Sequence, residues 1–206
     1  EVRFKDDGKG KDAFSGHSSA PEDNWTEWFG EPLDAKSGQK TSSWLIRSAD
    51  DPAYGEKGRK PKKVLRKSKI TGTAQLEWNN EKGDFNYEMP LGHLFYLQLP
   101  YPLQEGKKYE LAIGPKLGSD TVSREFVFDP VQNRTEAIHV NLVGYMSVPS
   151  VKAVDLYHWM GNGGPRDYSA YAGNKIYLYD VNTKEKHEAG TVNFWKKRQA
   201  EYHGYD

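Results

Sequence analysis

Two pairs of adjacent carboxylates, Asp6-Asp7 and Asp50-Asp51, are the first candidates for chemistry in this sequence. Hydrolysis of a glycosidic bond needs two carboxyl groups about 5 to 9.5 Å apart that face one bond. Adjacent residues of an extended chain point to opposite sides, so neither pair is suited to this reaction. We expect both pairs to be solvated loop acids. The alternative is a structural calcium site at the surface, and no other cofactor is expected.

Other common catalytic patterns are absent from the sequence. Cysteine does not occur, and the six histidines lack the spacing of a zinc site. The glycine-rich stretch Gly161-Asn162-Gly163-Gly164 is not followed by a predicted helix, so it does not have the context of a phosphate loop. We therefore expect no catalytic residue in this chain.

Aromatic side chains are better candidates, because the apolar face of a sugar ring stacks on Trp or Tyr. One group lies on or beside the glycine-rich loop and comprises Trp159, Arg166, Asp167, Tyr168 and Tyr171. A second group falls in or next to the irregular first part of the chain and comprises Trp25, Trp28 and Trp44. Both groups are candidates for carbohydrate or interdomain contacts, and the first lies on a loop, where function is often placed. The alternative for the first group is a loop docked on its own module. For the second group, core or inter-module packing is favoured over a platform for sugars.

A basic segment runs from Lys57 to Lys69 without an acidic residue. One interpretation is a site for sulfated or uronate polysaccharide, or for nucleic acid, and the other is a solvated loop. The segment has no interleaved aromatic residues, and the chain balances 29 basic against 29 acidic residues. We therefore expect no nucleic-acid partner.

The composition favours small β modules. The chain has 206 residues, of which 36% are hydrophobic and 13% aromatic, and its mean hydropathy is -0.88. This is polar for a folded protein, but the aromatic content argues against disorder. No apolar run approaches the roughly 18 residues of a membrane span.

The strands predicted for the first module follow from alternation and from short apolar runs bounded by turns. Residues Ile70 to Trp78 alternate strictly between apolar and polar side chains. Further strands are predicted at Phe85–Met89, Leu94–Leu99, Tyr109–Ile113 and Ser123–Phe128. Strands at this spacing indicate a β-sandwich over residues 1–134, with long irregular loops before Ser43 and a linker from Asp129 to Arg134.

A second β module is predicted over residues 135–206. Its strands are expected at Ala137–Val143, Val151–Trp159, Asn174–Asp180 and Gly190–Trp195. A sandwich of this class needs about seven strands, so four indicate an incomplete module. The fold expected for the chain is all-β, with two β-sandwich modules.

The stretch Glu136 to Tyr145, with Pro149 beyond it, carries a family resemblance. It resembles the first strand of the N-terminal immunoglobulin-like domain of family 9 glycoside hydrolases, which are cellulases. That pattern is an apolar-x-Val-Asn-Gln-x-Gly-Tyr run, from which this sequence departs at Leu142. Residues Val151 to Val154 resemble the second strand, and Leu97 to Leu111 resemble the extra β-sandwich that precedes this domain in some bacterial members. The ending Tyr202 to Asp206 resembles the point before the strand that completes the domain.

The resemblance implies a secreted, periplasmic or cell-surface bacterial protein that acts on polysaccharide. Catalysis in the family lies in a following helical barrel domain, whose Asp-Ala-Gly-Asp motif this chain lacks. The expected function is therefore a non-catalytic accessory region of a glycoside hydrolase, with the catalytic domain and the polysaccharide as its partners. Two alternatives stay open: a self-standing glycan-binding or adhesion protein, and an accessory module of another enzyme such as a polysaccharide lyase.

Overall fold

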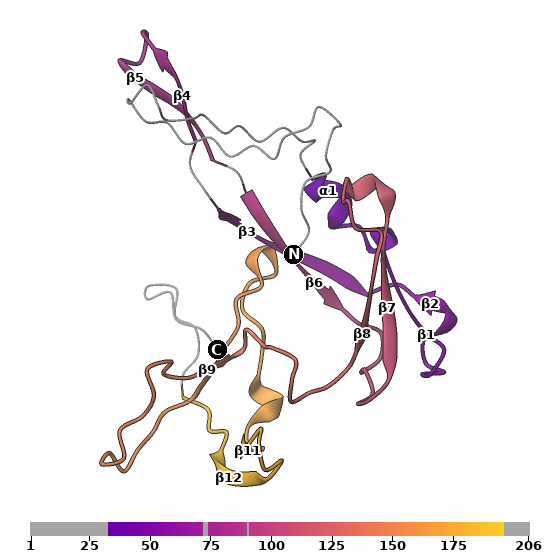
Figure 1. The fold of residues 1–206 in the computed structure, drawn as a ribbon, viewed down its shortest axis with the longest axis vertical. Coiled ribbons are helices and arrows are strands. Elements are labelled where there is room, and N and C mark those ends of the chain that lie inside the picture. The colour runs from indigo at the N-terminus through magenta and orange to yellow at the C-terminus, as the bar shows by residue number, and fades with distance from the viewer. Residues whose placement is uncertain (1–32, 72–73, 90, 196–206) are drawn as a thin grey trace. The chain divides into compact units, whose positions relative to one another are not determined.

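The computed structural model describes residues 33–71, 74–89 and 91–195 (Figure 1). These residues are mostly β-strand with little helix, which confirms the all-β prediction. The chain divides into two compact units between Phe128 and Asp129, at the start of the predicted linker. In the described ranges, no helix has the length and apolar character needed to cross a membrane.

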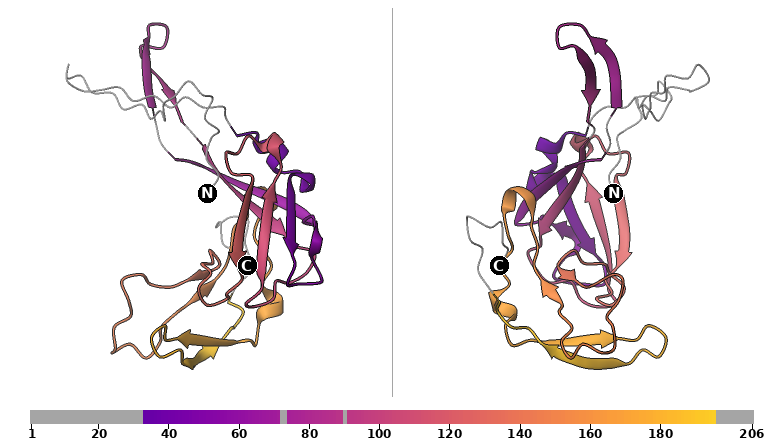
Figure 2. Two further views of the ribbon diagram at one scale, coloured as in Figure 1. Left: turned by 45° about the vertical axis from the view of Figure 1, so that its right-hand side comes forward. Right: turned by 90° about the vertical axis from the view of Figure 1, so that its left-hand side faces the viewer.

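A four-stranded antiparallel sheet forms one part of the first unit. Its strands are β1 (Trp44–Ser48), β2 (Gly55–Arg59), β7 (Lys108–Ile113) and β8 (Ser123–Val127), in the order β2-β1-β7-β8. The strands run side by side in all three views (Figures 1 and 2). Alternate side chains of β1 are buried, as expected for a strand with one face on a core.

The other strands of the first unit form one long antiparallel hairpin. Its base is β3 (Lys63–Ile70) paired with β6 (Leu91–Gln98), and its outer part is β4 (Ala74–Asn79) paired with β5 (Asp84–Glu88). The strand predicted from Ile70 to Trp78 is found in part: Ile70 is the last residue of β3, and the residues from Ala74 onward form β4. The basic segment is also largely strand, in β2 and β3, and not the loop of the alternative interpretation.

The core of the first unit is built from both sets of strands. One buried cluster joins Trp44, Val64, Ile113 and Leu117, with Phe95 and Leu97 of β6 packed against it. A second cluster joins Ile46, Tyr54 and Tyr109. The helix α1 (Ala35–Gly38) approaches the first cluster so closely that a Cβ on Gly38 would lie 2.4 Å from Phe95 Cζ. Glycine is therefore needed at this position.

Asp51 is fully buried, which corrects the expectation of a solvated loop acid. Its Oδ2 accepts a hydrogen bond from Tyr109 Oη at 2.6 Å, and its Oδ1 accepts one from the Ala53 amide at 3.0 Å. Tyr109 Oη in turn accepts the Gln104 amide at 2.9 Å. The carboxylate is satisfied by these donors, as buried polar groups usually are, and it orders the turn between β1 and β2.

The second unit has shorter strands than the sequence predicted. β9 (Ile138–His139) pairs with β10 (Asp155–Leu156), and β11 (Lys175–Tyr179) pairs with β12 (Lys186–Thr191). The long strands predicted at 137–143 and 151–159 are therefore wrong over most of their length. β12 begins before the strand predicted at 190–195 and ends at Thr191, so the two overlap at Gly190 and Thr191 only. A turn interrupts the first of them, where Asn141 Oδ1 accepts the Val143 amide at 3.0 Å.

Candidate functional site: an open apolar hollow in the second unit

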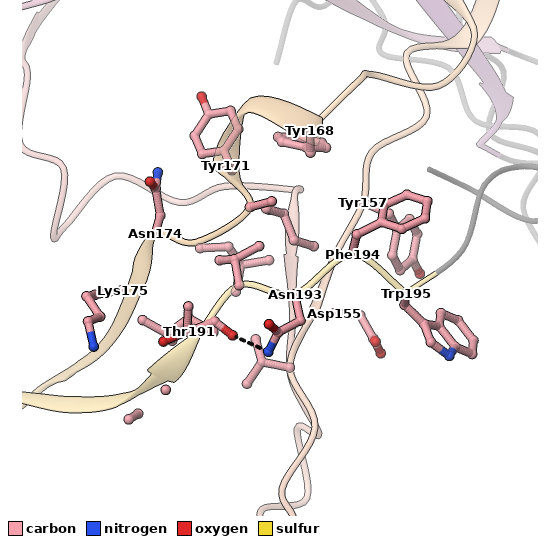
Figure 3. A pocket seen from close by; sticks show the side chains of 18 of the residues that line it. Asp155, Tyr157, Tyr168, Tyr171, Asn174, Lys175, Thr191, Asn193, Phe194 and Trp195 are labelled. Atoms are coloured by element: carbon pink, nitrogen blue, oxygen red, sulfur yellow. Dashed lines mark hydrogen bonds between the residues drawn. The ribbon is translucent and has the colours of Figure 1, made fainter.

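Two pairs of strands in the second unit line an open hollow of about 1270 Å³ (Figure 3). Side chains from β9 and β10 line it together with side chains from β11, β12 and the segment after β12. Pockets for small molecules have volumes of roughly 300 to 1,000 Å³, so the volume of this hollow is larger than that of a typical small-molecule site. Most of its lining is apolar, including Ile138, Val154, Leu156, Ile176 and Val192.

The second unit leaves much of its apolar surface in solvent. In the part of this unit that the structure describes, Ala137 and Tyr168 are the buried apolar side chains. By contrast, Ile138 is 54% exposed and Tyr177 is 53% exposed, although both line the hollow. A folded unit of this kind normally covers such side chains, because burying one contributes about 1.5 to 3 kcal/mol. The hollow is therefore a surface suited to apolar contact with another polypeptide segment or domain.

The glycine-rich loop is folded back on itself beside the hollow. Trp159 pairs with Pro165 in an isolated antiparallel bridge, and the Arg166 amide donates to the His158 carbonyl at 2.9 Å. The turn between them contains the 3-10 helix η3 (Gly161–Gly163), where Gly161 and Gly164 have positive φ. These contacts place the following residues, Asp167 to Tyr171, at the hollow.

Three of the predicted loop residues form one cluster. The Arg166 guanidinium lies 5.1 Å from the centre of the Tyr168 ring, and the Tyr168 and Tyr171 rings meet edge to face at 5.4 Å. Arg166 Nη2 donates to Tyr171 Oη at 3.5 Å. Asp167 Oδ1 accepts the Ser169 amide at 2.8 Å, at the start of the 3-10 helix η4 (Ser169–Tyr171).

Tyr168 carries an unpaired buried hydroxyl. Tyr168 is 9% exposed, and Oη makes no hydrogen bond of ordinary geometry in the described part of the chain, although the Arg166 guanidinium lies near it. Burial raises the pKa of Tyr168 above its ordinary value, against the lowering effect of the nearby Arg166 guanidinium. A buried hydroxyl without a partner costs about 1 to 3 kcal/mol. The position is therefore one at which a further donor or acceptor would be favourable.

A second apolar surface lies on the connection between β9 and β10. Leu142 is 96% exposed and Val143 is 97% exposed, and Met146, Val148 and Val151 are also largely exposed. The connection is nonetheless held in place: Tyr145 Oη donates to the Ala153 carbonyl and accepts the Asn141 amide at 3.2 Å. Gly144 has a φ of 102°, a conformation that favours glycine. Asn141, Gly144 and Tyr145 thus shape this turn, in which Leu142 and Val143 are exposed to solvent.

The remaining predicted residues have different positions. Trp44 is in the core of the first unit, where it is 4% exposed and its Nε1 donates to the Gly38 carbonyl at 2.7 Å. It therefore offers no ring face to a sugar. Trp25 and Trp28 lie outside the described residues.

Several aromatic residues of these surfaces were not predicted. Tyr157, Phe194 and Trp195 line the hollow near Asp155 and Asn193 (Figure 3). Trp195 is 80% exposed, so its ring is available to solvent although the sequence placed it in a strand. On the first unit, Trp78 and Phe85 meet edge to face at 5.0 Å on the β4–β5 part of the hairpin, and Trp78 is 51% exposed. Trp78 and Phe85 flank a turn that was predicted from the sequence, and this position indicated that their side chains could meet.

The described residues contain no group of three or more His, Cys, Asp or Glu side chains that could hold a metal ion. Lys175 at the hollow is paired with Glu188 at 2.6 Å. The other polar side chains that line the hollow are Lys152, Asp155, Asp167, Ser169, Asn174, Thr191 and Asn193. The arrangement is thus suited to binding through apolar and aromatic contact with a polar rim. Comparison with known proteins found no matching family model, no matching curated protein and no matching solved structure.

Proposed function

We propose that this chain is a non-catalytic accessory region of a secreted bacterial glycoside hydrolase that resembles cellulases. In this proposal both units are β-sandwich modules, and the second is an immunoglobulin-like module. The open apolar hollow of the second unit and the exposed turn at Leu142 and Val143 contact the catalytic domain of the same enzyme. The region stabilises that domain and positions it on polysaccharide.

The open apolar surface of the second unit is the observation that carries this proposal. Soluble proteins rarely expose a large contiguous apolar patch unless another surface covers it. Here the exposed side chains include both the hollow and the β9–β10 connection, within one unit of fewer than a hundred residues. A covering domain would bury these side chains and could supply the partner that Tyr168 Oη lacks.

The turn at Asn141 to Tyr145 supports the family resemblance on which the substrate class depends. Asn141, Gly144 and Tyr145 each have a structural task in that turn, through a side-chain cap, a positive φ and a cross-connection to Ala153. The position at which the sequence departs from the family pattern, Leu142, makes the turn more apolar. This change favours contact with protein over contact with solvent.

A self-standing glycan-binding protein is the second candidate, and the β4–β5 hairpin favours it. Trp78 and Tyr87 are 51% and 47% exposed there, and Phe85 packs against Trp78. Exposed aromatic rings on a hairpin can stack on sugar rings. In this candidate the first unit binds the polysaccharide, and hydrolysis plays no part.

The loop cluster provides a test in the product of the complete gene. The double variant Arg166→Ala/Tyr168→Ala should lower the thermal midpoint and the rate of polysaccharide hydrolysis, because the contact between the second unit and the catalytic domain is weakened. The matched control is Val181→Ala/Lys186→Ala, which changes two exposed residues of the same unit that do not line the hollow. Unchanged activity and unchanged stability in the loop variant would refute the proposed contact. A gene product without any hydrolytic activity on polysaccharides would favour the second candidate.

A further inference from the structure

The basic segment of the first unit forms a defined face and not a solvated loop. Its last part is strand β3, which pairs along its whole length with β6 (Figure 1). Val64 and its partner Leu97 both pack on the core cluster around Trp44. Because side chains alternate along a strand, Lys63, Lys67 and Lys69 lie on the opposite face. This outward face of the β3–β6 pair, together with the exposed lysines that lead into it, is called the basic face below.

Four lysines of the basic face have no acidic partner in the part of the chain that the structure describes. Lys60, Lys62, Lys63 and Lys69 are exposed, and their side chains make no ion pair or hydrogen bond within the described ranges. The facing strand β6 contains no acidic residue, and neither does the segment from Lys57 to Lys69. Like charges this close repel one another, so an external anion would be favourable here.

The basic face also has an apolar component. The Lys67 ammonium lies 5.5 Å from the centre of the Tyr96 ring, which stands on the same face of the neighbouring strand. Leu65 lies directly opposite Tyr96 in the pairing and shares that face. A ligand that combines negative charge with apolar ring faces would therefore match the surface better than a simple inorganic anion.

We propose that the basic face binds an acidic polysaccharide, with the lysines contacting its carboxylate or sulfate groups and the sugar rings lying along Leu65 and Tyr96. Nucleic acid fits less well. Nucleic-acid-binding domains usually have a pI above about 9, whereas this chain has a pI of about 7.3. Single-stranded nucleic acid also needs successive aromatic platforms, and this face has Tyr96 alone among its described side chains. The choice of a polysaccharide rests in part on the proposed function, but the requirement for the lysines does not.

Binding by the 206-residue chain tests the proposal with four probes at two salt concentrations. The probes are polygalacturonate, dextran sulfate, unmodified dextran and a 30-nucleotide oligothymidine. The test variant is Lys60→Gln/Lys62→Gln/Lys63→Gln/Lys69→Gln. The matched control removes four exposed lysines of the same unit: Lys36→Gln/Lys40→Gln/Lys82→Gln/Lys116→Gln. Both variants have the same net charge, and their thermal midpoints are measured in parallel.

We expect the chain to bind polygalacturonate or dextran sulfate, but not dextran, and to bind more weakly as salt increases. The two acidic probes distinguish carboxylate from sulfate recognition. The test variant should bind about thirtyfold more weakly, the product of four exposed charge contacts at a factor of about two to three each. The control should bind as the original chain does. Equal losses in both variants, equal binding to dextran, or tighter binding to oligothymidine than to either acidic polysaccharide would overturn the proposal. The first two outcomes leave the contact between the second unit and a catalytic domain untouched, so the two proposals can fail separately.

Discussion

The unpaired hydroxyl of Tyr168 leads to a prediction with an unusual sign. Substitution of a buried tyrosine by phenylalanine usually lowers stability, because the hydroxyl loses its hydrogen bond. Here Oη makes no hydrogen bond of ordinary geometry within the described residues, and Tyr168 is 9% exposed. The Tyr168→Phe variant of the 206-residue chain should therefore be more stable than the original chain.

The size of the effect follows from the cost of the unpaired group. A buried hydroxyl without a partner costs about 1 to 3 kcal/mol, and we take the lower value because the Arg166 guanidinium lies nearby. For a unit of this size, about 1 kcal/mol corresponds to a rise of about 4 to 8 °C in the thermal midpoint. Phenylalanine keeps the ring that meets Tyr171 and Arg166, so packing should not change.

Differential scanning calorimetry measures this change, since it can separate the transitions of the two units. Tyr171→Phe is the matched control: Tyr171 is 39% exposed, and its hydroxyl should contribute less than about 0.5 kcal/mol. An unchanged or lower midpoint for Tyr168→Phe would refute the assignment of an unpaired hydroxyl. Under the proposed function the catalytic domain supplies the partner, so the same substitution in the complete enzyme should lower the midpoint.

Three further predictions concern the first unit. Tyr109→Phe removes the hydrogen-bond donor to the buried Asp51 carboxylate. It should lower the free energy of unfolding, measured by urea denaturation, by about 1 to 3 kcal/mol. An unchanged free energy would contradict the role given to this hydrogen bond. Burial raises the pKa of Tyr109 and Tyr54 above the ordinary value of 10.0. Their contribution to the free energy of unfolding is therefore complete below pH 10.0 and is lost as the pH rises further. Thermal midpoints measured from neutral pH upward should therefore fall in the alkaline range. The fall should be less steep for Tyr109→Phe than for the original chain, and equal slopes would contradict the role given to Tyr109. Gly38→Ala should lower the thermal midpoint, because its Cβ would lie 2.4 Å from the Phe95 ring, whereas an unchanged midpoint would show that Phe95 moves freely.

Strands with apolar alternation or short apolar runs were predictable, and strands without them were not. The runs at Leu94–Leu99 and Tyr109–Ile113 predicted β6 and β7, because their side chains pack on the core. β3 was missed because Val64 is its one buried side chain, and lysines occupy every outward position except that of Leu65. A period-2 pattern is hidden when polar residues also occupy half-buried positions.

The candidate site was predictable only in part. The glycine-rich loop and its aromatic residues stand out in the sequence, and Tyr168 and Tyr171 do meet at the hollow. Phe194 and Trp195 were assigned to a strand, because the sequence does not show that β12 ends at Thr191. The short pairing of β9 with β10 was also hidden, since a continuous apolar pattern does not reveal the turn capped by Asn141. Side-chain caps and partners distant in sequence decide such features.

The sequence of the encoding gene downstream of the Asp206 codon tests the central claim most directly. The account predicts an open reading frame that continues into a helical-repeat domain with an Asp-Ala-Gly-Asp motif. A catalytic domain of this kind would be the surface that covers the open apolar side chains of the second unit. A stop codon shortly after Asp206, or a continuation without such a domain, would contradict it.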